Sequence, residues 1–244
     1  MIIVKNKKSS INKLKSDYPG AIIIDVTSQA KDQFIRFSPF YPHGGIPVPF
    51  SPGWHAMSVE SIWQGLKDYK KVGIDTSLFK NSTMQNLKRT IRRFGEIKGH
   101  RKGVGGTEIL EYLDARKLIY LPTYKWVLVN KLSNEVSKLR ELAETNTVIL
   151  LDYATNGDVE NTSSALSHAA LIKAYIEGNY PECAESEKVA EPKADFQIGR
   201  KINHPSFGEG TITQIDGLKV NVSFAEVGEK VISVSFLNKL LSNE

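Results

Sequence analysis

An acidic stretch without apolar periodicity, residues 182–195, divides this chain of 244 residues into two unequal parts. Its sequence, ECAESEKVAEPKAD, holds five acids, two lysines and a proline, and such a composition does not form a packed core. We therefore expect a domain over residues 1–181, an exposed linker over 182–195, and a small module over 196–244.

The excess positive charge lies in the large N-terminal part. Residues 1–181 hold 25 basic and 17 acidic residues, a net charge of +8, whereas residues 196–244 hold five of each. Such a field favours an anionic partner, meaning a nucleotide, a nucleic acid or a phosphorylated metabolite. A surface that is merely rich in lysine explains the same charge, so both interpretations stay open.

Composition excludes several classes of protein. No apolar run approaches 18 residues, and the apolar start of the chain is too short for a signal peptide, so we expect a cytoplasmic protein without a membrane partner. One cysteine, Cys183, excludes a disulfide framework and any zinc finger that needs two thiolates. The five histidines show no metal-ligand spacing, and we expect neither a metal nor a cofactor.

The apolar pattern predicts an α+β fold, with a helix-rich N-terminal domain around a small sheet. Five prolines and three glycines among aromatic residues predict an ordered loop over residues 37–54, packed onto the domain. Buried strands are predicted at 21–26 and 148–151, and helices at 58–71, 84–94, 107–118, 123–143 and 166–177.

Three polar side chains share one face of the helix predicted at 58–71. Glu60, Gln64 and Lys67 are spaced at i, i+4 and i+7, which places them within about 60° of one another, beside Trp63. A carboxylate, an amide and an amine beside an indole suit a site in which Glu60 moves protons and Lys67 acts as a nucleophile. The same spacing also fits an ordinary solvated helix face.

This helix and the loop before it resemble the core signature of the NADAR family. The matching residues are Ser38, Pro39, Phe40 and Tyr41, followed by Ser58, Val59, Glu60, Gln64 and Lys67. Members of that family are similar to N-glycosidases that act on ribosylated bases, and some remove ADP-ribose from guanine. The N-terminal part also resembles a set of uncharacterised bacterial and phage proteins.

The NADAR resemblance implies that Glu60 and Lys67 are the catalytic pair, with Gln64 beside them. Lys67 would attack the anomeric carbon of an opened ribose while Glu60 handles protons, in a pocket walled by Trp63 and the Phe40–Tyr41 segment. The substrate would be an ADP-ribosylated or ribosylated base, free or within a nucleic acid.

A basic, glycine-rich run over residues 88–106 follows, and it predicts the phosphate-binding side of the site through Arg92, Arg93 and Arg101. A basic helix edge with a flexible loop is the alternative. Asp25 and Asp152 each follow an apolar strand, where a carboxylate often reaches a cleft and as often caps a turn. Of these two, we place Asp152 in the substrate site.

The last module predicts about five short strands, the size of an SH3-like barrel. Residues 199–212, 220–224 and 228–230 resemble the Tudor-like domain that ends certain superfamily-1 repair helicases. Those domains are docking modules, so the resemblance implies a protein partner. The zero net charge of residues 196–244 argues against tight binding to nucleic acid.

Two functions remain open at this stage. The first is an N-glycosidase tethered by a docking module. The second is a non-catalytic protein that binds a nucleotide or nucleic acid, in phage–host conflict. A glycosidase of this kind needs Glu60 and Lys67 to face one pocket, whereas a binding protein needs neither in a defined geometry.

Overall fold

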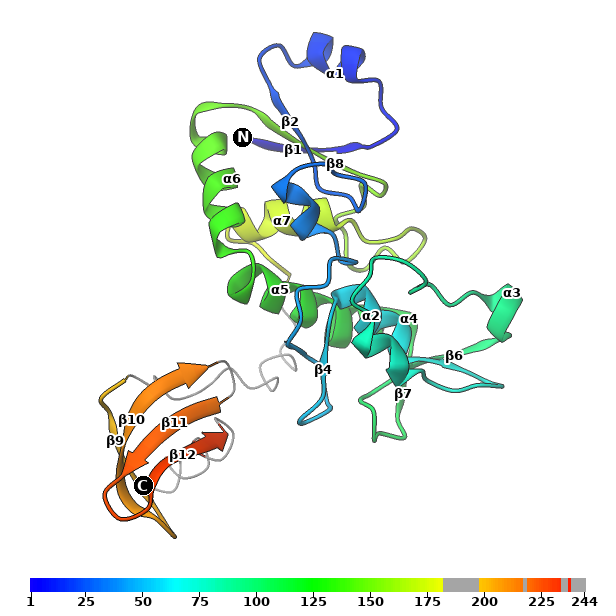
Figure 1. Ribbon diagram of the computed structural model, residues 1–244. Helices are drawn as coiled ribbons and strands as arrows, with labels where there is room; N and C mark the ends of the chain where they lie inside the picture. The colour runs from blue at the N-terminus through cyan, green and yellow to red at the C-terminus, as the bar shows by residue number, and fades with distance from the viewer. Residues whose placement is uncertain (182–197, 217–218, 234–236, 238–244) are drawn as a thin grey trace. The chain divides into compact units, whose positions relative to one another are not determined.

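A computed structural model describes residues 1–181, 198–216, 219–233 and 237. The chain forms two compact units, Met1–Val189 and Ala190–Glu244, and each is described by itself (Figure 1). The predicted linker, residues 182–195, lies outside the described residues. The predicted α+β class is confirmed, since helices and several small sheets make up the described chain. All helices of the described residues are too short or too polar to cross a bilayer.

A three-stranded parallel sheet forms the centre of the first unit. Its order is β1 (Ile2–Asn6), β8 (Val148–Asp152), β2 (Ile22–Asp25), so the last strand in sequence lies between the first two. Every residue of β8 is buried, which fits its unbroken apolar sequence. Both strands predicted from the sequence are therefore confirmed, although only β8 is buried throughout and β2 is mostly half-buried. Asp152 is the last residue of β8.

Helices cover both faces of this sheet. On one face, Leu14 of α1 (Ile11–Asp17) packs with Ile149 and Leu151. On the other face, Val148 and Leu150 join the main core with residues of α6 (Ser133–Thr145) and α7 (His168–Ile176) (Figure 1). The predicted helix at 166–177 is thus confirmed as α7, which begins at its cap Ser167.

The helix predicted over residues 58–71 is wrong in its second half. Helix α2 (Val59–Gly65) ends early, and Lys67 begins strand β5 (Lys67–Tyr69) instead. This strand pairs with β6 (Ile97–Arg101), which pairs with β7 (Ile109–Leu110), in an antiparallel sheet that sequence periodicity did not reveal. The cross-strand partner of Lys67 is His100.

Three other predicted helices, at 84–94, 107–118 and 123–143, are corrected. Of the helix predicted at 84–94, only α3 (Ile91–Phe94) exists. The region from 107 to 145 contains α4 (Tyr112–Ala115), a π-helical segment η3 (Arg116–Tyr120), α5 (Leu121–Asn130) and α6. Pro122 lies in the first turn of α5 and does not interrupt the chain of helical segments, because the early backbone N–H groups of a helix need no partner within it.

The Pro/Gly/aromatic loop is ordered and packed, as the sequence predicts. Phe37, Ile46 and Val48 are buried in the main core. The loop contains a short ladder between β3 (Ile46–Pro47) and β4 (His55–Ala56). A 3₁₀ segment, η1 (Gln33–Phe37), leads into the loop, and a second one, η2 (Thr76–Lys80), follows β5.

The second unit is an antiparallel sheet in the order β12-β11-β10-β9. The predicted SH3-like barrel is corrected, because the four described strands leave β9 and β12 as edges and do not close on each other. Apolar residues on one face, Ile212, Val220 and Val222 among them, form a separate small core. The strands are β9 (Lys201–His204), β10 (Gly208–Asp216), β11 (Lys219–Phe224) and β12 (Gly228–Ser233).

The close packing of Gly65, the last residue of α2, against Phe79 can be tested by substitution. A Cβ atom at Gly65 would lie 2.3 Å from Cε1 of the buried Phe79 ring, so we expect Gly65→Ala to destabilise the protein by about 1–3 kcal/mol. Helix propensity alone predicts the opposite sign. Gly105→Ala is the control, because nothing lies within 4 Å of a Cβ there. Urea unfolding of both variants measures the difference, and equal stabilities would contradict the packing.

Candidate functional site

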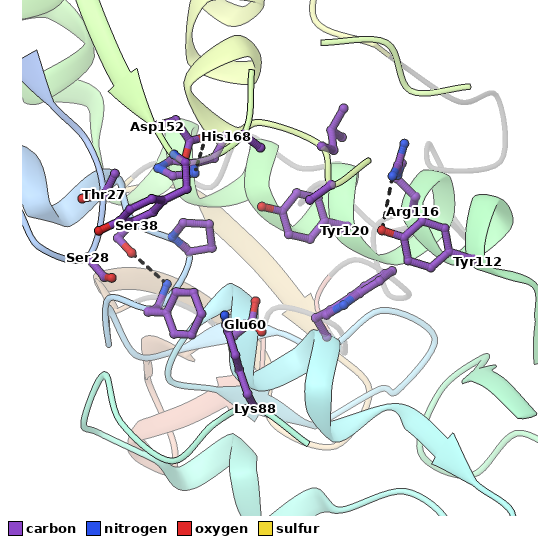
Figure 2. Close-up of a pocket in the computed structure, with 17 residues that line it drawn as sticks. Thr27, Ser28, Ser38, Glu60, Lys88, Tyr112, Arg116, Tyr120, Asp152 and His168 are labelled. Carbon is purple, nitrogen blue, oxygen red and sulfur yellow. Dashed lines mark hydrogen bonds and ion pairs between the residues drawn. The ribbon is translucent and has the colours of Figure 1, made fainter. Parts of the chain in front are cut away.

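A cavity of about 300 Å³ lies where the carboxyl ends of β2 and β8 meet α2 and η3. Ligands of parallel sheets commonly bind at this end of the strands. Figure 2 shows Asp152 and His168 at one end of the cavity and Lys88 at the other, with Glu60 and Tyr120 between them. The aromatic and charged residues that line it include Phe40, Glu60, Trp63, Lys88, Tyr112, Arg116, Tyr120, Asp152 and His168.

Glu60 is fixed in the first turn of α2. Ser58 caps this helix by a reciprocal pair of 3.1 Å hydrogen bonds with Ser61, and the Glu60 backbone N–H donates to the Pro39 carbonyl at 2.8 Å. Val59 and Ile62 anchor the helix in the core. The Glu60 side chain is thereby held at the cavity wall although the residue is only 8% exposed.

Gln64 links Glu60 to Lys67. The Gln64 amide nitrogen donates to Glu60 Oε1 at 2.8 Å, and Lys67 Nζ donates to Gln64 Oε1 at 3.3 Å. The backbone N–H of Arg89 also donates to Gln64 Oε1, at 3.1 Å, and a backbone N–H can only donate. This fixes the amide so that its nitrogen faces Glu60. The three residues are therefore brought together as expected, although Lys67 comes from a strand and does not line the cavity.

Burial shifts the pKa of Glu60 and of Lys67, the two ends of this chain of hydrogen bonds. Burial raises the pKa of Glu60, although the Gln64 bond and the amines of Lys67 and Lys88 oppose the rise. Burial lowers the pKa of Lys67; the Glu60 carboxyl opposes this, and the positive charges of Arg89 and Lys88 lower the pKa further. The raised pKa of Glu60 shifts it toward the protonated form, which can donate a proton.

Asp152 lies in the opposite electrostatic environment. Its Oδ2 accepts from Ser167 Oγ at 2.8 Å and lies 3.0 Å from His168 Nδ1, and its Oδ1 accepts from the Tyr153 backbone N–H at 2.7 Å. Burial acts to raise the pKa of Asp152, but His168, the Ser167 hydroxyl and the Ala169 backbone N–H lower it overall. Asp152 is therefore an ionised carboxylate at the cavity wall.

His168 carries the positive charge opposite Asp152. Its Nε2 lies 2.9 Å from the Val26 carbonyl, which can only accept, while Nδ1 faces the Asp152 carboxylate. Both ring nitrogens therefore donate, which is the geometry of an imidazolium. Burial alone would lower the pKa of His168, and the charge of Asp152 reverses this and raises it.

Aromatic rings form much of the cavity wall. Trp63 makes edge contacts with Tyr112 and Tyr120, each at 5.8 Å between ring centroids, and its ring lies 3.8 Å from that of His100. Burial lowers the pKa of His100 to about 3, so this ring is neutral. The cavity-lining rings of Phe40, Trp63, Tyr112 and Tyr120 make an aromatic wall that suits a flat ligand such as a nucleobase.

Arg116 is a buried cavity residue that the sequence analysis missed. Its guanidinium donates to the carbonyls of Val159, Asn161 and Ser164 at 2.8–3.0 Å and to the Tyr112 hydroxyl at 3.2 Å. These bonds hold the loop between β8 and α7 against η3. Regular spacing was an available signal, because Tyr112, Arg116 and Tyr120 recur every fourth residue.

The residues predicted to bind substrate separate into two groups. Phe40, Trp63 and Asp152 line the cavity with Glu60. Tyr41 does not, and its ring packs on His43 at 4.8 Å instead.

The three predicted phosphate-binding arginines also lie away from the cavity wall. Arg92 and Arg93 are exposed on α3, and Arg101 pairs with buried Asp68, its Nε donating at 2.9 Å. Lys88, from the same basic run, reaches the cavity with its Nζ 5.6 Å from the Phe40 ring centroid. Asp25 is neutralised by Lys7 at 2.6 Å and does not line the cavity.

No group of three His, Cys, Asp or Glu side chains in the described part of the chain could hold a metal ion. Residues 6–172 match the model of a family of unknown function, DUF6939. The chain belongs to the DUF6939 family. Every cavity residue of this DUF6939 protein falls within the match, since they run from Thr27 to His168. Comparison with curated proteins and with solved structures found no match.

The Asp152–His168 pair of the DUF6939 protein predicts a defined pH dependence of stability. The raised pKa of His168 makes its contribution complete below pH 6.5 and lost as the pH rises through the folded value. The lowered pKa of Asp152 makes its contribution complete above pH 3.8 and lost as the pH falls. The difference in Tm between the wild type and His168→Gln is therefore expected to be largest between these two values. Thermal unfolding from about pH 3 to pH 9 measures it, and a difference independent of pH would contradict the ion pair.

Proposed function

We propose that this protein is an N-glycosidase that hydrolyses the bond between a ribose and a base in a ribosylated or ADP-ribosylated ligand. One observation carries the proposal: Glu60 and Asp152 line the same cavity in environments that move their pKa values in opposite directions. A neutral acid and an ionised carboxylate are the pair that glycoside hydrolysis uses.

In this proposal Glu60 is the general acid. Its proton passes to the nitrogen of the leaving base as the bond between the anomeric carbon and that nitrogen breaks. Gln64 donates to Glu60 Oε1, which leaves Oε2 to carry the proton. A neutral leaving base departs more readily than an anionic one, so this transfer lowers the barrier.

Asp152 supplies the negative charge. An oxocarbenium-like sugar develops positive charge, which the Asp152 carboxylate stabilises. A water molecule then adds its oxygen to the anomeric carbon, and Asp152 accepts the proton that this water loses. The net reaction consumes one water and releases a sugar with a free anomeric hydroxyl and a neutral base that carries the proton from Glu60. The proton taken up by Asp152 returns to Glu60 through solvent before the next turnover.

The remaining cavity residues fit the rest of such a ligand. Phe40 and Trp63 offer ring faces to the base, and the Lys88 amine offers positive charge to a phosphate. The NADAR resemblance, which passes through Phe40, Glu60 and Lys67, points to the same ligand class. We extend the proposal to the second unit as a docking module for a protein partner, on the basis of its Tudor-like sequence and zero net charge.

Binding without chemistry is the second candidate function. The position of Lys67 favours it over a glycosidase in which Lys67 is the nucleophile. The Lys67 amine donates to Gln64 and does not line the cavity, so attack on a ligand held there would require that bond to break. The acid–base route through Glu60 and Asp152 requires no such movement. In the acid–base route, Lys67 acts on the site through its charge rather than as a nucleophile.

Substitution of Glu60 and Lys67 separates these routes. Glu60→Gln is expected to lower kcat by about 10²–10⁴-fold, because it removes the proton donor while keeping the shape. Lys67→Arg keeps the charge but cannot form an imine, so the acid–base route retains turnover whereas the covalent route loses it. Glu96→Gln, at an exposed carboxylate paired with Lys70, is the matched control and should act like the wild type.

The assay is incubation with ADP-ribosylated DNA, ADP-ribosylated RNA and free ribosylated nucleosides, followed by mass spectrometry of the released base. Borohydride is added in parallel to trap any sugar attached to Lys67. A trapped adduct together with an inactive Lys67→Arg variant would establish the covalent route. Retention of all three substrates intact by the wild type, with measurable binding, would establish the binding function instead.

The phosphate contact is tested separately with free ADP-ribose. Lys88→Gln is expected to weaken binding by about tenfold and to reduce its salt dependence, because it removes the exposed amine at the cavity. The double variant Arg92→Gln/Arg93→Gln distinguishes a local contact from a wider basic surface. Weakening by the double variant and not by Lys88→Gln would place the phosphates on α3. Calorimetry at two salt concentrations measures both.

A further inference from the structure

Two buried tyrosines, Tyr124 and Tyr180, lie near the half-buried Tyr120, and the three hydroxyl groups differ in one respect. The Tyr124 hydroxyl donates to the Phe37 carbonyl at 2.8 Å, and the Tyr180 hydroxyl donates to the Leu121 carbonyl at 2.9 Å. The Tyr120 hydroxyl makes no hydrogen bond to any residue that the structure describes. Tyr120 lines the cavity and its hydroxyl is not enclosed by the protein, so a molecule held in the cavity can reach it.

The backbone around Tyr120 is itself unusual. Arg116–Tyr120 forms a π-helical turn, a rare conformation that is frequent at functional sites. The turn directs both of its end residues, Arg116 and Tyr120, at the cavity. The Tyr120 ring is held on two sides, since it stacks on Tyr124 at 6.1 Å and 8° and meets the edge of Trp63 at 5.8 Å. The position of its hydroxyl is therefore set by packing.

The Tyr120 hydroxyl points into the middle of the cavity, between the two carboxyl groups (Figure 2). Burial raises the pKa of Tyr120 well above its usual value, and the nearby carboxyl groups of Glu60 and Asp152 raise it further when they are ionised. The phenol is thus a neutral group that can donate one hydrogen bond and accept others.

We propose that the Tyr120 hydroxyl is a ligand-binding group that hydrogen-bonds an oxygen of the sugar held between Glu60 and Asp152. This inference rests on the proposed function for the identity of the ligand. The sugar is assigned because its anomeric carbon must lie between the acid and the carboxylate, next to this hydroxyl. The protein leaves the hydroxyl without a partner of its own, so binding of the sugar satisfies it.

The first arm of the test needs no ligand. Tyr120→Phe removes a hydroxyl that bonds to no described residue, so the Tm of the full chain should stay within about 1 °C of the wild type. Tyr124→Phe and Tyr180→Phe are matched controls that each leave a buried carbonyl without its donor, and each should lower the Tm by about 3 °C. A loss of Tm in Tyr120→Phe equal to that of the controls would overturn the proposal.

The second arm measures binding of free ADP-ribose by calorimetry. Tyr120→Phe is expected to bind it about tenfold more weakly than the wild type, and Tyr124→Phe within about twofold. Equal affinities of the wild type and Tyr120→Phe would overturn the ligand contact while leaving the glycosidase proposal intact.

A wild type that binds no ADP-ribose would count against the proposed function instead. The same comparison is then made with adenosine, guanosine and ribose 5-phosphate. If none of these binds either, the ligand contact of Tyr120 is overturned together with the proposed function.

Discussion

The buried carboxylate of Asp152 is the interaction on which the arrangement of the cavity depends. It receives the Ser167 hydroxyl and the His168 ring from the start of α7, and His168 in turn bonds the Val26 carbonyl just after β2. One ion pair thus joins the ends of two parallel strands to the helix that covers them. Breaking such a buried pair by removing one partner leaves an uncompensated charge, which is why the geometry is held firmly.

The contrast between Glu60 and Asp152 follows from the number of donors that each receives. Asp152 is approached by hydroxyl, imidazolium and backbone N–H groups, whereas Glu60 receives only the Gln64 amide in an otherwise buried position. Burial without donors raises a carboxyl pKa, and burial with several donors lowers it. The pKa values of two carboxyl groups on one cavity are therefore moved in opposite directions by the residues around them.

The sequence predicted the parts of this fold that depend on local pattern. The buried strands ending at Asp25 and Asp152 were found because apolar β-branched runs need no distant partner to be recognised. Helix α2 was extended too far because Lys67 belongs to a strand whose partner, β6, lies about thirty residues away. The grouping of Glu60 with Gln64 and Lys67 survived this error, since a hydrogen bond replaces the helical spacing. Tyr120 was missed because a π-helical turn has no period that distinguishes it from an α-helix broken at Pro122.

Part of the positive charge of the first unit is buried or paired with acids rather than free on the surface. Arg89 and Arg116 are almost fully buried and donate to carbonyl groups, and within the described residues neither forms an ion pair with a carboxylate. Arg101 and Lys7 are paired with acids. The net charge of +8 over residues 1–181 is therefore partly buried, and less of it is free on the surface than the sequence implied. Burial is the main reason why the pKa of the Lys67 amine is lowered, and Arg89, which lies directly behind Gln64 and Lys67, lowers it further against the opposing effect of Glu60.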